Sequence, residues 1–231
     1  MVLVKTPQGA ESGTAVSTAR RVAIPSENTV PGRVGSSSFA RGGVETAAGS
    51  SRVRAVSCVE DEAVNQRLYI ANAGVVLVGP YLPRLFSMLE LTNEGAFLSL
   101  SCAQRAVHLI QYIVTGATLT PEPMLVLNKI LCGLAISEPV ALDIDLRAQE
   151  RAAIEEMLEA IIAHWKAIGR TSIAGLRESF LQRGGRLVRG DESWQLRVES
   201  KCFDMLLDRL PWGYGMVKYP WMKRVLHVDW R

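Results

Sequence analysis

The sequence has little of what enzymes and metal proteins usually carry. Only four of its 231 residues are cysteines, and no two of them form a CxxC pair. The chain also lacks a GxSxG nucleophile elbow, an HExxH helix and a phosphate loop ending in GK[ST]. These absences argue against a zinc site, the common hydrolase classes and a P-loop nucleotide site. The cysteines are therefore interpreted as small buried hydrophobic residues of a protein from a reducing compartment. They are Cys58, Cys102, Cys132 and Cys202.

Charge and hydropathy exclude two further classes. The net charge is only +3, and no run of Lys and Arg is long enough for a nucleic-acid footprint. The longest uncharged segment, residues 68–83, is shorter than a bilayer span and is interrupted by Pro80 and Pro83. No secretory signal is recognisable at the start. We therefore expect a soluble, cytoplasmic protein without bound nucleic acid and without stable membrane insertion.

The chain divides into two regions of different composition. Residues 1–65 are rich in Gly, Ser and Ala, and Phe39 is their only aromatic residue. Such a segment buries too little apolar area to offset the entropy of ordering, so we expect a flexible, disordered arm. Residues 66–231 carry the periodic apolar patterns of a globular domain.

Helical periodicity dominates the first part of this domain. In residues 101–116, Ala106, Leu109 and Ile113 lie on one stripe at helical spacing, and Gly116 ends the pattern. The segment 67–78 is predicted to be extended or buried, and a short helix follows it. Thr120 and Asp145 are predicted helix N-caps. The other predicted helices cover residues 120–133, 149–169 and 171–185.

After Gly185 the apolar residues recur every 2 residues, as in a strand, instead of every 3.6 residues, as in a helix. Residues 185–200 read as a hairpin in which Trp194, Leu196 and Val198 share one face. Residues 215–220 and 225–230 supply two more extended pieces. The predicted fold class is therefore α+β, a mainly helical block followed by a small antiparallel β-rich C-terminal part.

Candidates for chemistry are few. His164, Asp204 and Asp208 are the one set that would support an enzyme or ligand-binding site, provided that they converge in a pocket. The alternative interpretation is that His108 and His164 are partly exposed structural residues. On that interpretation Asp204 and Asp208 are solvated acids beside Lys201 and Arg209. We favour this second interpretation and expect no catalytic residue, no cofactor and no metal.

Aromatic residues are concentrated at the C-terminal end. Tryptophan combines a large apolar area with a polar N–H group, which suits both a core and an interface hot spot. The sequence leaves both uses open for these residues. The candidate partner-docking residues are Trp212, Tyr214, Tyr219, Trp221 and Trp230.

Six blocks in a fixed order resemble the C-terminal domain of the tape measure proteins of contractile injection systems. No block is catalytic, but their common order over residues 66–231 makes the resemblance specific. The blocks are YIANAGVVLVGPYLPRLF (69–86), AQRAVHLIQYIVTG (103–116), PEPMLVLNKILCG (121–133), HWKAIGRTSIAGLRESFLQRGG (164–185), WQLRVESKCFDMLLDRLPWGYGMVKYPWM (194–222) and VDW (228–230).

The resemblance implies a structural protein of a phage-tail-like particle. A tape measure protein lies in the tail tube during assembly and sets its length, with its C-terminal end at the baseplate and spike. The implied partners are tail tube and baseplate or spike-hub proteins, with an oligomeric arrangement inside the tube left open. The family usually has a longer region before this domain. The 65 residues here span about 100 Å as a helix or about 230 Å when extended. A baseplate plug or adaptor without a ruler role is therefore the alternative.

Overall fold

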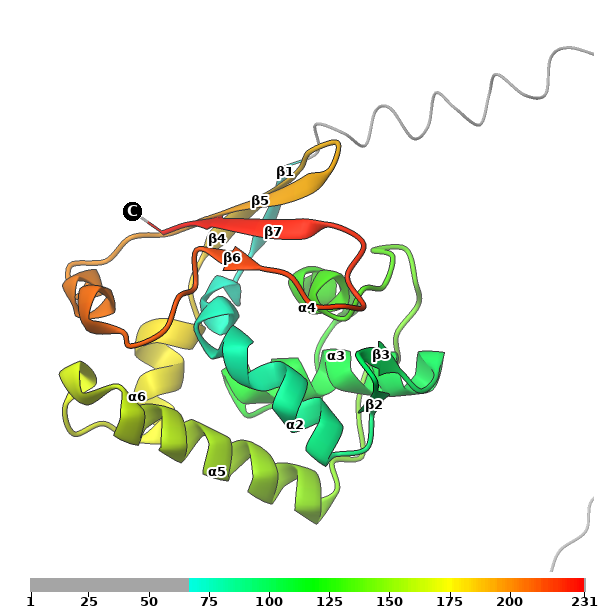
Figure 1. Ribbon diagram of the computed structural model, residues 1–231, viewed down its shortest axis with the longest axis horizontal. Helices are drawn as coiled ribbons and strands as arrows, with labels where there is room; N and C mark the ends of the chain where they lie inside the picture. The colour runs from blue at the N-terminus through cyan, green and yellow to red at the C-terminus, as the bar shows by residue number, and fades with distance from the viewer. Residues whose placement is uncertain (1–66, 231) are drawn as a thin grey trace, which may run out of the picture. The chain divides into compact units, whose positions relative to one another are not determined.

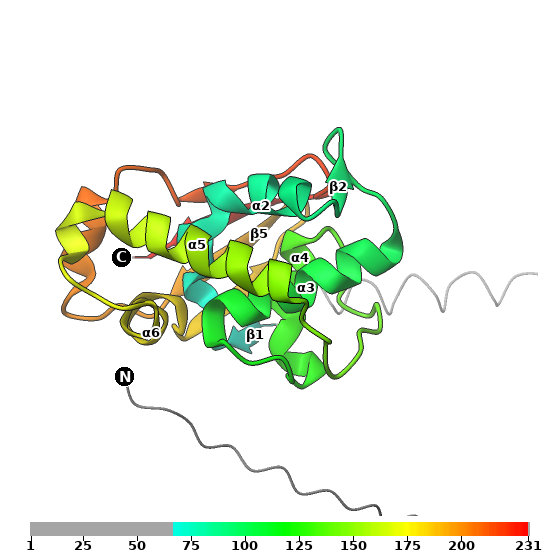
Figure 2. The same cartoon turned by 90° about the horizontal axis from the view of Figure 1, so that it is seen from below.

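The computed structural model describes residues 67–230. They form a five-stranded sheet with helices packed against one of its faces (Figures 1 and 2). The strands are β1 (Arg67–Ile70), β4 (Gly185–Arg189), β5 (Ser193–Val198), β6 (Met216–Val217) and β7 (Val225–Asp229), and β2 (Thr92–Asn93) pairs with β3 (Ala96–Phe97) as a separate ribbon. The α-helices are α2 (Leu82–Met88), α3 (Leu100–Thr115), α4 (Val126–Leu131), α5 (Ala148–His164) and α6 (Ile173–Leu176). The 3₁₀ helices are η2 (Ala73–Tyr81), η3 (Glu122–Leu125), η4 (Lys166–Ile168) and η6 (Asp204–Arg209), and η5 (Arg177–Leu181) is a π-helical turn.

The predicted α+β class is confirmed, with a difference in the sheet. The strand order is β1-β4-β5-β7-β6, and β5 pairs with β7 in parallel, so the sheet is mixed. Parallel neighbours need a long crossover, which residues 199–224 supply. The edge strand β1 comes before all the described helices in the sequence, whereas the other four strands come after all the described α-helices. The sheet therefore joins the two ends of the domain.

Helix α3 forms as its periodicity predicts. Ala106, Leu109 and Ile113 are fully buried. The Ser99 hydroxyl caps the first turn by accepting from the Cys102 N–H at 3.1 Å. Gly116 ends the helix with φ of 75°, a left-handed conformation that glycine adopts without strain.

Two predicted N-caps are wrong. Pro121 rather than Thr120 precedes the first turn, which is the 3₁₀ helix η3, and α4 begins only at Val126. Helix α5 starts after Arg147 rather than after Asp145. The Glu150 carboxylate accepts from the Arg147 N–H at 2.9 Å and forms an ion pair with Arg105 of α3. A carboxylate inside the first turn thus replaces the cap that was expected before it.

The segment after β1 is buried but not extended. Residues 73–81 form the 3₁₀ helix η2, in which every residue from Ala73 to Gly79 is buried. Just before it, Asn72 is held in a buried amide network: its Nδ2 donates to Gln111 and to Asn128 at 3.2 and 2.8 Å. Of the segment 67–78, predicted to be extended or buried, Arg67–Ile70 is extended as β1, and burial is continuous from Asn72 onward. The sequence did not indicate the helix type, because a run that is buried on all sides carries no periodicity.

Gly74 is the closest approach between η2 and the helical layer. A Cβ atom built at this position would lie 1.7 Å from the Phe180 carbonyl oxygen and 2.7 Å from the Leu181 Cα. Both neighbours are backbone atoms of η5, so neither can rotate away. The contact between η2 and η5 therefore requires glycine.

Replacing Gly74 by alanine is expected to destabilise the domain by about 2 kcal/mol or more, because one element must move to relieve the overlap. Chemical denaturation of the full chain measures the change. Gly213→Ala is the matched control, since no atom lies within 4 Å of a Cβ there. Equal stability of the two variants would contradict the assigned contact.

His108 was expected to be partly exposed, and this is wrong. Its side chain is 4% exposed, on the buried face of α3, and its Nε2 has no hydrogen-bond partner among the described residues. Burial lowers the pKa of His108 below its ordinary value, and Arg105 adds to the lowering, although the Ala141 backbone and Asp143 act in the opposite direction. The folded protein therefore holds a neutral imidazole.

The stability of the domain is expected to fall as the pH drops below about 6.5, the ordinary pKa of histidine. In that range the unfolded chain binds a proton that folded His108 does not take up, so acid favours unfolding. Denaturation at pH 7 and pH 5 measures this loss, and His108→Gln should reduce it. A variant with the same pH dependence as the native chain would show that His108 is not its source.

Candidate functional site

The aromatic C-terminal segment, residues 210–230, runs along η2 and the helices to the last strand. All three of its indole N–H groups donate to atoms of the domain itself. Trp212 binds the Leu77 carbonyl at 2.8 Å, Trp221 the Leu131 carbonyl at 2.8 Å and Trp230 the Asp204 carboxylate at 3.0 Å. The end of the described chain is therefore fastened at three separate points.

The Trp212 contact compensates for a proline. In a 3₁₀ helix the carbonyl of residue i accepts from the N–H of residue i+3. For Leu77 that residue is Pro80, which has no N–H. The Trp212 indole supplies the missing donor. Its ring also packs edge-on against Tyr81, with ring centroids 5.2 Å apart.

Tyr219 and Trp221 fasten the segment further along. The Tyr219 hydroxyl donates to the Gly79 carbonyl of η2 at 2.7 Å. Burial, followed by the nearby Cys132, raises the pKa of Tyr219 well above its ordinary value, so the phenol stays protonated and keeps its donor. The Trp221 ring lies 5.0 Å from Phe97 and 5.1 Å from Tyr219. Its indole satisfies a carbonyl at the C-terminal end of α4.

Trp230 closes a buried ionic cluster. Arg183 is fully buried and forms an ion pair with Asp204, whose other oxygen accepts from Trp230. The remaining guanidinium N–H groups reach the Ser179 and Glu199 carbonyls at 2.7 and 3.1 Å. Asp204 was expected to be a solvated acid, and this is wrong, because the buried Arg183 compensates its charge.

The proposed catalytic set does not converge. Asp204 lies in this buried cluster, whereas His164 is exposed and its Nδ1 lies 3.1 Å from the Tyr81 hydroxyl. The hollow of about 390 Å³ next to His164 is lined by neither Asp204 nor Asp208. Within residues 67–230, no three His, Cys, Asp or Glu side chains are grouped to hold a metal ion.

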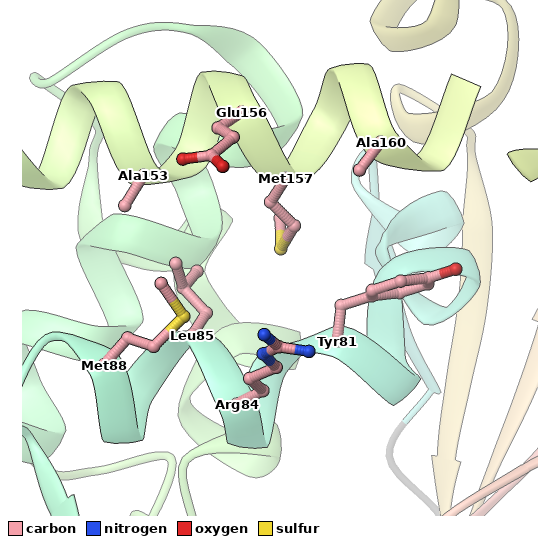
Figure 3. Close-up of a pocket in the computed structure, with 8 residues that line it drawn as sticks. All are labelled: Tyr81, Arg84, Leu85, Met88, Ala153, Glu156, Met157 and Ala160. Atoms are coloured by element: carbon pink, nitrogen blue, oxygen red, sulfur yellow. The ribbon is translucent and has the colours of Figure 1, made fainter. Parts of the chain in front are cut away.

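A second cavity, of about 230 Å³, lies between α2 and α5. Leu85 and Met157 face each other across it, and Arg84 and Glu156 come from opposite helices (Figure 3). Its lining is mostly apolar and brings together no nucleophile and base. This groove therefore offers no arrangement for catalysis.

The sequence was compared with protein families, with curated proteins and with solved structures. The model of the family described as contractile injection system tape measure protein matches residues 5–230. The chain belongs to this family. No curated protein and no solved structure matches it significantly. The match confirms the resemblance and extends it over most of the segment before β1.

The five candidate docking residues of this tape measure domain differ in how far they are buried. Tyr219 and Trp230 are buried, whereas Trp212, Tyr214 and Trp221 remain partly exposed. The buried pair anchors the segment. Docking to a partner stays a prediction, and it concerns the exposed sides of the other three residues.

Sequence reasoning missed two features of this site. Arg183 precedes Gly184 and Gly185, and its surroundings gave no sign of a buried arginine. Pro80 shows in the sequence that the Leu77 carbonyl needs another hydrogen-bond donor, but only if residues 73–81 are known to form a 3₁₀ helix. Neither feature is visible in apolar periodicity, because both depend on contacts between distant parts of the chain.

Trp221→Phe should destabilise this tape measure domain by about 1–3 kcal/mol, since it leaves the Leu131 carbonyl without its donor. Trp221→Ala should cost about 3–5 kcal/mol, because it also opens a cavity. Thermal and chemical denaturation measure both changes. Met205→Ala is the control, because that side chain is 69% exposed and should change little. An unchanged melt for Trp221→Ala would show that the ring is not part of the core.

Proposed function

We propose that this tape measure protein acts in assembly of the tail tube and docks at the baseplate or spike end of the particle. The family match over residues 5–230 carries the proposal. The domain supports it, because a C-terminal segment fastened at Leu77, Leu131 and Asp204 presents a rigid surface rather than a loose tail. Rigid presentation lowers the entropy lost on binding.

An enzymatic role receives no support from the site. The family is a structural one, and His164 and Asp204 lie in different environments. A membrane role through residues 68–91 is also disfavoured, because residues 73–79 are buried in the core. None of the helices between residues 67 and 230 is long and apolar enough to cross a membrane. We infer that the protein is made in the bacterial cytoplasm and is incorporated there into the particle.

The ruler role and the plug role make different demands on the N-terminal residues. A ruler sets tube length through its own length, so shortening it must shorten the tube. A plug or adaptor needs only its docking surface. The family match favours a role in assembly, whether as a ruler or as a plug. Of these two roles we propose the ruler, which controls tube length.

Deleting the gene should abolish particles or make their lengths irregular, and purified protein should co-sediment with tube or spike-hub subunits. Electron microscopy of particle number and length measures the first effect. For the ruler role, removing 30 of the first 65 residues should shorten the tube by about 45 Å if that part is helical in the tube, or by about 100 Å if it is extended there. An unchanged length with normal particle numbers would favour the plug. Normal particles in the full deletion strain would refute the assembly role altogether.

A further inference from the structure

Within residues 67–230, one face of the five-stranded sheet carries no helix. The helices lie on the other face, where Leu187, Leu196 and Leu226 are buried (Figures 1 and 2). Side chains alternate between the faces of a strand. The residues between these leucines therefore point away from the helices. They form a surface that we call the outer sheet face.

The outer sheet face has the composition of a protein interface. It contains three arginines, one tyrosine and one methionine, and no lysine or glutamate. The outward residues are Arg67, Tyr69, Arg186, Val188, Ser193, Gln195, Arg197, Met216, Val225, His227 and Asp229. Interface cores are enriched in Arg, Tyr and Met and depleted in Lys and Glu. Tyr69 and Met216 are also 79% and 65% exposed, which is high for large apolar side chains.

The arginines are placed against each other at a cost to the free domain. Arg186 lies directly opposite Arg197 in the β4–β5 pair. Like charges in opposite positions destabilise a sheet. Arg197 has an exposed ion pair with Asp229, with N and O atoms 3.7 Å apart. Arg67 and Arg186 form no ion pair with any residue between 67 and 230.

The acids near this region do not neutralise the face. Asp191 and Glu192 lie in the turn between β4 and β5. Glu199 lies beyond the end of β5, where its carboxylate packs over Gly184. The centre of the face thus keeps an excess of positive charge beside an exposed tyrosine ring.

We propose that the outer sheet face binds an acidic protein surface of the particle. Carboxylates of the partner would lie opposite Arg67, Arg186 and Arg197, and an apolar recess would receive Tyr69. The repulsion between Arg186 and Arg197 is then relieved in the complex, because each gains an opposite charge. The inference rests on the proposed function for the identity of the partner, a tail tube or spike-hub subunit.

Two other occupants fit the face less well. Nucleic acid binding needs a longer basic track, whereas the outer sheet face carries three arginines, one of which, Arg197, is paired with Asp229. A second copy of the chain would bring a face with the same excess of positive charge. Both are separate outcomes of the test below.

The test uses the full chain and purified tail tube and spike-hub subunits, with binding measured at about 50 and 200 mM salt. Arg67→Glu/Arg186→Glu should lower the affinity at least tenfold and remove most of its salt dependence. Tyr69→Ser should lower the affinity without changing the salt dependence. Incorporation of the same variants into particles, relative to sheath protein, should fall in parallel.

Arg84→Glu/Arg170→Glu is the matched control. Both arginines are exposed, lie outside the sheet, and give the same change in net charge. This variant should bind as the native chain does. An equal loss of binding would show that the effect comes from overall charge, and would overturn the proposal.

Arg186→Thr separates binding from folding: it should weaken binding while the melting temperature stays equal or rises, because it removes the repulsion with Arg197. A lower melting temperature would contradict the strain on which the inference depends.

The remaining outcomes distinguish the alternatives. Binding of a 30-nucleotide single strand that is lost in Arg67→Glu/Arg186→Glu, with normal incorporation, would assign the face to nucleic acid. A dimer seen in sedimentation and lost in that variant would assign it to a second copy. If gene deletion disturbs the particles but the double variant is incorporated normally, this inference fails and the proposed function stands. If gene deletion has no effect, the proposed function itself fails.

Discussion

The domain depends on η2, a 3₁₀ helix of small and apolar residues that is buried from Ala73 to Gly79. A buried backbone must find partners for its N–H and C=O groups, and a 3₁₀ helix with Pro80 inside it cannot supply them all. The donor that Leu77 lacks comes from the far end of the chain, from the Trp212 indole. From the same end the Tyr219 hydroxyl gives a second donor to the Gly79 carbonyl, which also accepts from the Leu82 N–H. The N-terminal and C-terminal parts of the domain are thus held together by the hydrogen-bond requirements of one short helix.

This constraint explains the aromatic ending. A leucine could fill the same space, but it would leave carbonyls at Leu77 and Leu131 without donors, at a cost of about 1–3 kcal/mol each. Tryptophan fills space and donates through one side chain. Trp230 serves a different purpose, since it satisfies the second oxygen of Asp204, whose first oxygen pairs with buried Arg183. Packing and hydrogen bonding therefore select the same residue type at three positions.

The sequence allowed the elements to be predicted better than the contacts between them. The apolar stripe of α3 and the alternation in β5 report directly which side faces the core, so both were found. The 3₁₀ form of η2, the burial of Arg183 and the parallel pairing of β5 with β7 were not found. Each depends on a partner more than ten residues away. The sequence left core and partner contact open for the five candidate docking residues, and the structure shows that Tyr219 and Trp230 are buried whereas Trp212, Tyr214 and Trp221 keep exposed sides.

The two sides of the sheet differ in what remains available for a partner. On the helical side the three indole N–H groups and the Tyr219 hydroxyl donate within the domain, so that docking there would use mainly exposed ring surface. The outer sheet face differs from the helical side. Arg67 and Arg186 form no ion pair among the described residues, and the Tyr69 side chain is exposed. Binding gains most where charge and area are not yet satisfied internally. A tape measure protein that uses its tryptophans to build the domain would therefore bind its neighbours mainly through its arginines.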